Sequence, residues 1–211
     1  MHIRLTQPQI QSSTAAVVVL SVLLYWSKDV VDFPITLIHF VLIGSLALHF
    51  GSQLWVTFIA GFVMFRALPR QMFGEVQSQL FPLFFLLSLT MSVITMATYL
   101  LTLKADTWTL SQLVQVCVLG IGCLAAFANC LVFAPGTISA MMERCDAETK
   151  MGVSSVVGKI DSRSYSKENA KYREIHKRFI RWHCYSSLAN VVTLASNLVF
   201  MYYLASKLVL R

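Results

Sequence analysis

The stretch LALHFGSQLWVTFIAGFVMFRALPRQMFGEVQSQLFPLFF, residues Leu46 to Phe85, decides the fold of this chain. It begins in one long apolar run and ends in another, and a short polar connection over residues 66–79 separates the two. The connection opens with Arg66-Ala-Leu-Pro-Arg70, where proline disfavours continuation of a helix. Apolar runs of this length on both sides of a polar turn are typical of a transmembrane helical hairpin.

The composition indicates a membrane protein rather than a soluble domain. Of the 211 residues, 56% are apolar and only 13% are charged, whereas soluble domains carry roughly a quarter charged residues. A bilayer core needs about 20 consecutive apolar residues for each helical span. Four uncharged stretches qualify: Ile35–Phe65, Leu80–Leu103, Leu110–Ala134 and Cys184–Leu204. The sequence therefore predicts an all-α, polytopic membrane protein with a four-helix transmembrane bundle.

The predicted spans divide the chain into four parts. Residues 1–34 form an N-terminal extension and residues 35–134 hold the first three transmembrane helices. Residues 135–183 form a cytosolic loop, and residues 184–211 hold the fourth helix and a short tail. Within the extension, residues 14–26 are apolar but short for a span, which favours an interfacial or partly inserted helix. A fifth span and an uncleaved signal are the alternatives.

Proline and glycine mark the expected ends of helices. Pro82 is predicted in the first turn of the second span, where its missing N–H costs little. The sequence Ala134-Pro135-Gly136 is expected to end the third span. Residues 138–148 should then be helical again, and the glycines and serines of residues 150–166 indicate a flexible linker.

A basic amphipathic helix is predicted over residues 167–182, directly before the last span. Its apolar positions recur at intervals of three and four residues: Tyr172, Ile175, Phe179 and Trp182. Such a helix suits a membrane interface with anionic headgroups or the surface of a partner, and packing on the protein's own loops is the alternative. The residues assigned to lipid-interface or partner contact are Lys171, Arg173, Lys177, Arg178, Arg181 and Trp182.

The positive charge of the chain is placed next to the membrane. The formal net charge is +7, and twelve of the 17 Lys and Arg residues lie in residues 66–79 and 135–183. Positive-inside reasoning puts both of these loops in the cytosol and both termini on the lumenal or extracellular side. We therefore expect anionic headgroups and a larger membrane protein as partners, and no nucleic acid.

Polar side chains recur along the predicted spans at helical intervals. At membrane depth such groups usually face the bundle interior or a water-filled cavity. They predict an intramembrane seam that serves packing, or that lines a cavity for lipid headgroup, solute or proton. The set comprises Ser45, His49, Gln53, Thr57, Gln115, Asn129, His183, Ser186, Asn190, Thr193 and Asn197. Two pairs of small residues, Ala47/Gly51 and Gly122/Ala126, predict close approach of helix backbones.

The sequence predicts no metal site, no cofactor and no catalytic centre. The five cysteines form no CxxC pair, and no Cys/His pair has ligand spacing on one helix face. Motifs such as GxSxG, HExxH and the Walker loop are missing, and no predicted span contains a carboxylate. The acidic residues of the cytosolic loop alternate with basic ones, which indicates a solvated surface. An enzyme is therefore not expected.

The hairpin resembles the transmembrane protein 205 family. That family carries a Trp-Val-Thr-Phe segment, an Arg-x-Leu-Pro-Arg turn and a Gln-Ser-x-Leu-Phe-Pro re-entry, which match residues 55–58, 66–70 and 77–82. Further blocks match residues 135–143 and 181–197. The family-motif positions are Trp55, Thr57, Arg66, Pro69, Arg70, Gln77, Pro82, His183, Asn190 and Asn197.

The resemblance implies a four-span bundle of the endomembrane system, including the endoplasmic reticulum and secretory pathway, or of the plasma membrane. Members of the family are associated with secretory trafficking and with tolerance of platinum drugs, and they supply no defined reaction or binding residues. The resulting hypothesis is a non-enzymatic scaffold or accessory subunit of a larger membrane complex linked to lipid handling or secretory trafficking. The alternative is a small transporter or channel-like protein for lipid, solute, soft metal or platinum compounds.

Overall fold

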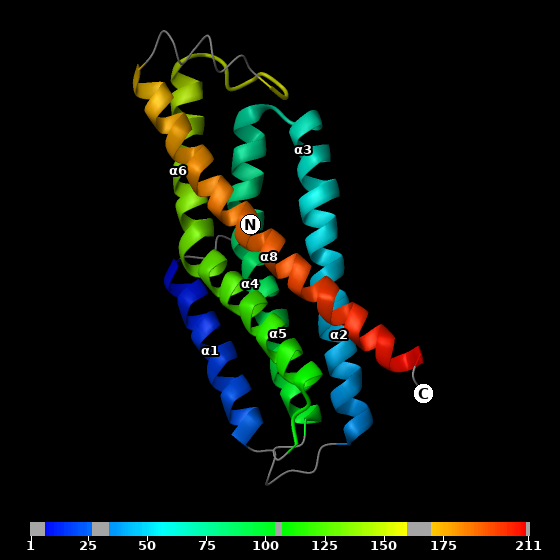
Figure 1. Cartoon of the computed structure of the whole chain (residues 1–211). Coiled ribbons are helices and arrows are strands. Elements are labelled where there is room, and N and C mark those ends of the chain that lie inside the picture. The colour runs from blue at the N-terminus through cyan, green and yellow to red at the C-terminus, as the bar shows by residue number, and fades with distance from the viewer. Residues whose placement is uncertain (1–6, 27–33, 104–106, 160–169, 210–211) are drawn as a thin grey trace.

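The computed structural model describes residues 7–26, 34–103, 107–159 and 170–209, and these confirm the all-α polytopic fold class. Figure 1 shows long helices running side by side as a bundle. Four helices in the described part are long and apolar enough to cross a membrane: Ile35–Ala67, Arg70–Thr102, Leu110–Lys150 and Ala170–Lys207.

The predicted hairpin is present, with a tighter turn than expected. Helix α2 (Ile35–Leu54), the π-helical turn η2 (Trp55–Ala60) and α3 (Gly61–Ala67) form one continuous helix. Helix α4 (Arg70–Thr102) follows after only two residues. Pro82 therefore lies well inside α4, and its predicted place in the first turn is wrong. The helix starts earlier because Pro69, at its N-cap, already provides the break and a preset backbone angle.

The third membrane helix continues past its predicted end. Helix α5 (Leu110–Ala128), the π-helical turn η3 (Asn129–Phe133) and α6 (Ala134–Lys150) are continuous, so the stop expected at residues 134–136 is wrong. Pro135 sits in the first turn of α6, immediately after the π turn. A helical proline leaves the carbonyl four residues earlier without its donor. Here that carbonyl belongs to η3, where the hydrogen-bond register already departs from the α-helix.

Helix α8 (Ala170–Val209) joins the predicted basic segment to the last span as a single helix of 40 residues. Residues 167–169 of the predicted basic helix lie outside the described residues. Helix α1 (Gln7–Trp26) runs along the lower half of the bundle in Figure 1 and packs against α4. Its Ile10 belongs to a core cluster with Phe84 and Phe85. The interfacial helix and the fifth span remain predictions for this segment.

The apolar interior of the described residues forms three clusters, one of which lies between α6 and α8 around Met141 and Phe179, and the remaining two lie within the bundle. One surrounds Phe84 and Phe85 on α4. The other joins Tyr99 on α4 to Phe200 on α8, whose rings meet edge to face with centroids 4.9 Å apart. Large apolar side chains such as Leu124 stay exposed on the outer faces. These outer faces suit contact with lipid chains, because lipid is as apolar as the side chains themselves.

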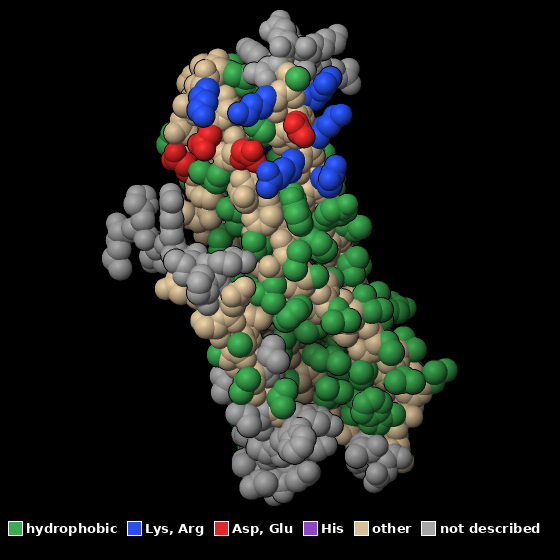
Figure 2. Space-filling view, turned by 90° about the vertical axis from the view of Figure 1, so that its left-hand side faces the viewer, with side chains coloured by type: hydrophobic (Ala, Val, Ile, Leu, Met, Phe, Trp, Pro, Cys, Tyr) green, Lys and Arg blue, Asp and Glu red, His purple; other side chains and the backbone are tan. Residues whose placement is uncertain are grey.

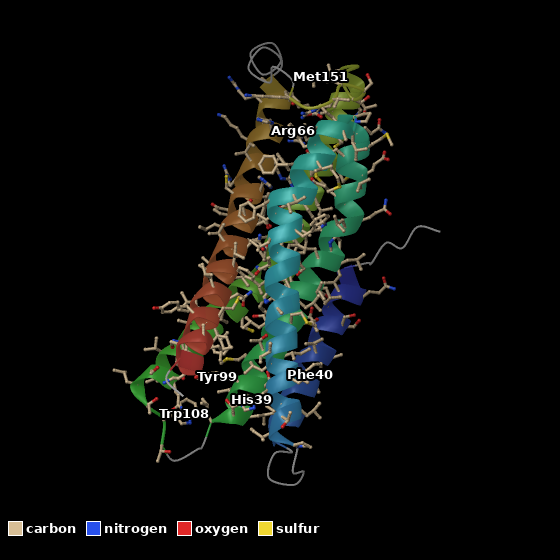
Figure 3. All side chains as sticks on the ribbon, turned by 90° about the vertical axis from the view of Figure 1, so that its right-hand side faces the viewer. His39, Phe40, Arg66, Tyr99, Trp108 and Met151 are labelled. Carbon is tan, nitrogen blue, oxygen red and sulfur yellow. The ribbon has the colours of Figure 1, made fainter. Side chains whose placement is uncertain are left out.

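Charged side chains gather at one end of the molecule, which we call the charged end. Figure 2 shows Lys, Arg, Asp and Glu there, and many apolar side chains over the lower right-hand part of that view. Arg66 and Met151 mark this end in Figure 3, whereas His39 and Trp108 lie at the opposite end. The turn between α3 and α4, the end of α6 and the start of α8 all meet at the charged end.

One of the two predicted pairs of small residues, Gly122/Ala126, lies where α5 and α8 approach each other closely. A Cβ atom added at Gly122 would lie 2.8 Å from the Cβ atom of Ser196 on α8. The other pair behaves differently, because a Cβ atom at Gly51 would meet nothing within 4 Å. Close backbone approach is therefore confirmed for Gly122, and the prediction is wrong for Gly51.

The Gly122→Ala variant should lower the thermal unfolding midpoint of the purified protein in mild detergent. Its new methyl group must push α8 away, and overpacking of this kind costs about 1–3 kcal/mol. Gly120→Ala is the control on the same helix, because a Cβ atom there meets nothing within 4 Å. An equal loss of stability in both variants would contradict the close contact of α5 and α8.

Candidate functional site

A buried carboxylate near the end of α6 organises the charged end. The side chain of Glu148 is 1% exposed. Arg70, the first residue of α4, donates from Nε to Oε2 at 2.9 Å and from Nη2 to Oε1 at 2.6 Å. The Tyr172 hydroxyl on α8 donates to the same Oε1 atom at 2.9 Å. One carboxylate thus ties together three helices that are distant in sequence.

The loop after α6 is also fastened to Arg70. Its Nη1 atom donates to the Gly158 carbonyl at 3.0 Å, and its backbone N–H donates to the Val156 carbonyl at 3.0 Å. Gly158 has a φ of 77°, which glycine adopts without steric cost. The segment up to residue 159 is therefore held against α4, unlike the flexible linker predicted there. The remainder of that predicted linker lies outside the described residues.

A second guanidinium group faces the same carboxylate. The Nε atom of Arg144 lies 3.5 Å from Glu148 Oε1, which is an ion pair without a hydrogen bond. The guanidinium carbon sits 3.9 Å from the centroid of the Phe179 ring on α8. Both the Arg144 and the Arg70 side chains are 11% exposed. Two buried positive charges therefore share one buried negative charge.

The apolar face of the first part of α8 packs on α6. Tyr172 and Phe179 are buried there, and a Cβ atom added at Gly136 would meet the Trp182 ring at 2.6 Å. This is the alternative in which the helix packs on the protein itself. The basic side chains stay exposed on its other faces: Lys171, Arg173, Lys177, Arg178 and Arg181. Their contact with headgroups or with a partner remains a prediction.

A pocket of about 520 Å³ lies beside this cluster, between η2, α3, α4, α6 and α8. Seven phenylalanine side chains line it: Phe62, Phe65, Phe73, Phe81, Phe84, Phe85 and Phe179. Arg70 and Arg144 lie at its charged end, and Asn190 lies at the deep end. The lining residues Phe62 and Ile180 are large exposed apolar side chains, so the pocket opens on the lateral surface of the bundle.

The pocket exists because α3 and α8 diverge. Helix α2 buries five residues, the last of which is Gln53, whereas η2 and α3 bury none. Figure 1 shows α8 crossing α2 and then running away from α3 toward the charged end. The space between the two helices is left to the aromatic side chains and to the pocket.

Part of the predicted polar seam forms a connected hydrogen-bond network between α2, α4 and α8, extending to η2. His49 is fully buried, with Nε2 2.8 Å from the Ser88 hydroxyl and Nδ1 3.1 Å from the Asn197 amide nitrogen. An amide N–H only donates, so Nδ1 accepts and the ring proton resides on Nε2. The Asn197 amide also donates to Gln53 Oε1 at 2.8 Å. His49 is thus held as a neutral side chain between two helices.

The network reaches the pocket through Asn190. Gln53 donates to Asn190 Oδ1 at 3.2 Å, and the Asn190 amide donates to the Thr57 hydroxyl at 2.9 Å. Both Asn190 and Thr57 line the pocket, and Thr57 belongs to the π turn η2. The extra residue of a π turn re-aims side chains, and such turns are frequent at functional sites. The deep end of the pocket is therefore polar.

The other predicted seam residues lie in smaller contacts. Asn129, in the second π turn, accepts from the Ser186 hydroxyl at 2.7 Å. Thr193 donates to the Gly122 carbonyl at 3.3 Å, and the hydroxyls of Ser45 and Thr95 are 2.9 Å apart. Gln115 is buried on α5, away from this network, and its Oε1 atom has no hydrogen-bond partner. His183 differs from all of these, because it is exposed and lines the pocket.

Three of the ten family-motif positions flank the turn between α3 and α4 at the charged end: Arg66, Pro69 and Arg70. Gln77 lines the pocket together with Arg70, and Pro69 pairs with Val157 of the loop. Trp55 and Arg66 are exposed on the outer surface. The motif therefore marks the turn that the loop and Glu148 hold in place.

Sequence reasoning misses Glu148, Arg144, Tyr172 and the aromatic wall. The carboxylates of this segment are expected on a solvated surface, which is wrong for Glu148 because it is buried. A signal was present, since Arg144 and Glu148 are four residues apart and share one helix face. Nothing in that spacing, however, shows which distant helix covers the pair.

The structure offers no cluster of metal ligands in the part that it describes. There, no group of three or more His, Cys, Asp or Glu side chains is placed to hold a metal ion. The five cysteines are free thiols, and Cys117 and Cys184 are exposed. The groups that line the pocket and could bind a ligand include guanidinium groups, amides and aromatic rings.

These observations define an integral, multi-pass helical membrane protein with a closed polar seam and a lateral aromatic pocket. A domain of unknown function, DUF4149, matches residues 44–146. The chain is 29% identical over 184 residues to Transmembrane protein 205 of Danio rerio, covering 85% of this chain and 96% of that protein. The chain is thus transmembrane protein 205-like, and the resemblance of the hairpin is confirmed. No solved structure matches it significantly. Neither of these two matches indicates an enzymatic activity.

The Glu148→Gln variant should lose about 3–5 kcal/mol of unfolding free energy, because two buried guanidinium groups lose their counter-charge. Thermal unfolding in detergent measures the loss. Glu143→Gln is the control. Glu143 on α6 forms an exposed ion pair with Arg178 on α8, and surface pairs contribute at most about 1 kcal/mol. Similar stabilities for the two variants would show that Glu148 does not organise the charged end.

Asn197→Ala should destabilise the bundle by about 1–2 kcal/mol, because His49 and Gln53 each lose a hydrogen-bond donor in an apolar setting. The control is Leu198→Ala, which truncates the neighbouring side chain on the outer face, where it is 56% exposed. Thermal unfolding of both variants in the same detergent tests the seam. A loss no greater in Asn197→Ala than in the control would be inconsistent with a packing role for the network.

Proposed function

We propose that this protein is a non-enzymatic membrane protein that holds a lipid from the surrounding bilayer in its lateral pocket. The observation that carries the proposal is the pocket itself: its walls are phenylalanine rings, and its mouth lies among exposed apolar side chains. Its volume of about 520 Å³ falls within the range of ligand sites, about 300–1,000 Å³. A molecule that enters between α3 and α8 from the side comes from the membrane.

The closed polar seam supports binding over conduction through the centre of the bundle. Its donors and acceptors are used on each other, and His49 and Gln53 are fully buried. A channel or solute pathway needs polar groups that face water. The transport alternative therefore retains support only at the pocket, where Asn190 and Thr57 join the seam.

We also propose that the protein acts as an accessory subunit or scaffold, through the exposed basic face of α8. Lys171, Arg173, Lys177 and Arg181 have no role in the core and remain open to anionic headgroups or to a partner membrane protein. Positive-inside reasoning supports a cytosolic charged end, and hence lumenal or extracellular termini. A role in lipid handling within the secretory pathway or at the plasma membrane fits this arrangement.

A tryptophan in the pocket tests the proposal. Native mass spectrometry of the protein purified in mild detergent should show bound lipid on the wild type. Ser187→Trp should remove this lipid, because Ser187 lines the pocket and the indole would fill it. Leu188→Trp is the control, because Leu188 is the next residue on α8, is 64% exposed and does not line the pocket.

Two results would overturn the lipid-binding function. One is a wild-type protein that retains no lipid in native mass spectrometry. The other is equal retention of lipid by Ser187→Trp and by Leu188→Trp, which would place the lipid on the outer surface instead of in the pocket. Thermal unfolding of both variants verifies that each one is folded.

A further inference from the structure

The charge at the head of the pocket is unbalanced. Arg70, Arg144 and Glu148 lie together with side chains that are 11%, 11% and 1% exposed. Two guanidinium groups therefore share one carboxylate, which leaves one positive charge in a largely buried place. A buried charge is unfavourable unless it is paired and hydrogen-bonded. Among the described residues that line the pocket, none carries a carboxylate that faces this charge.

The guanidinium group that the carboxylate neutralises less completely is that of Arg144 rather than that of Arg70. Arg70 uses Nε and Nη2 on Glu148 and Nη1 on the Gly158 carbonyl. The closest contact of Arg144 to the carboxylate is 3.5 Å, which is too long for a good hydrogen bond. Tyr172 and Arg70 already occupy the Oε1 atom that Arg144 approaches. Within the described part of the chain, the buried Nε of Arg144 therefore has no hydrogen-bond partner, and the side chain lines the pocket.

The setting of Arg144 suits an anionic group. Its guanidinium carbon lies 3.9 Å from the centroid of the Phe179 ring, and this cation–π contact holds the group beside the pocket. Guanidinium groups bind carboxylates and phosphates through paired N–H donors. The aromatic wall begins directly next to this guanidinium group, so the same pocket offers a site for an anionic group and an apolar groove for a hydrocarbon chain.

The length of the pocket matches one leaflet of the membrane. Along α8 it extends from Phe179 to Asn190, a rise of about 17 Å at 1.5 Å per residue. A hydrocarbon core is about 30 Å thick, so this distance corresponds to about half of it. The guanidinium group lies at the charged end, where the headgroups of one leaflet would be. An acyl chain would then follow the phenylalanine wall toward the middle of the bundle.

We propose that the ligand is an anionic lipid, whose headgroup binds Arg144 and whose acyl chain lies along the phenylalanine wall. This inference rests on the proposed lipid-binding function and specifies the headgroup. A free phosphate ion would satisfy the guanidinium but would leave the aromatic pocket empty. A neutral lipid would fill the pocket but would leave the charge of Arg144 unpaired.

The test compares two lipids with identical acyl chains, dioleoyl phosphatidylglycerol and dioleoylglycerol, which lacks the phosphate, titrated onto delipidated protein and followed by native mass spectrometry. We expect the wild type to bind phosphatidylglycerol at least about tenfold more tightly, as a charge-assisted hydrogen bond requires. Arg144→Gln should abolish the preference and Arg144→Lys should keep part of it. Arg66→Gln, which removes an exposed guanidinium that does not line the pocket, should leave it unchanged.

The wild-type titration separates the inference from the proposed function without any variant. Equal binding of the two lipids would overturn the anionic headgroup and leave the lipid-binding function in place. Binding of neither lipid would overturn both. A preference that persists in a folded Arg144→Gln protein would overturn the assignment of Arg144. Displacement of phosphatidylglycerol by millimolar inorganic phosphate would identify an anion site that does not require the acyl chain, and would also overturn the inference.

Discussion

The ion pair between Arg70 and Glu148 is the interaction on which the charged end depends. In a single buried contact it fixes the start of α4, the end of α6 and, through Tyr172, the start of α8. The loop is fastened to the same arginine by the carbonyl of Gly158. Because the carboxylate is buried, losing any one of these donors leaves its negative charge less well paired in an apolar environment. The helix ends are therefore placed by one polar cluster, while the apolar faces between them set only the general packing.

Inside the bundle, buried polar groups must also be paired, but here the partners are uncharged side chains. Lipid offers no hydrogen bonds, so polar groups at membrane depth must satisfy each other. His49, Gln53 and Asn197 do so across two helices, and Asn129 and Ser186 repeat the pattern at the second π turn. A network of this kind selects one register between α2, α4 and α8, since a shift by one residue would separate donors from acceptors. Gly122 contributes in another way, because it lets α8 approach α5 closely.

The sequence predicts the number and class of the helices well, since long uncharged runs have few alternatives in a bilayer. The spacing of His49, Gln53 and Asn197 also predicts that these residues face the interior. Two helix ends are predicted poorly: the third span continues through the π turn η3 past the expected proline and glycine stop, and α4 begins early, directly after Pro69. Glu148 could not be recognised as buried, because its burial depends on α4 and α8, which are far away in sequence.

The pocket follows from the polar seam and the charged end together. The polar seam ends near Thr57, where the π turn lies and where the helix no longer buries side chains. At the charged end, α6 occupies the inner face of α8 and holds it away from α3, because Phe179 and Tyr172 must reach Arg144 and Glu148. Between these fixed points the helices do not close, and phenylalanine rings line much of the space. An opening toward the membrane, with a guanidinium at one end and amides at the other, is therefore a consequence of how the polar groups are paired.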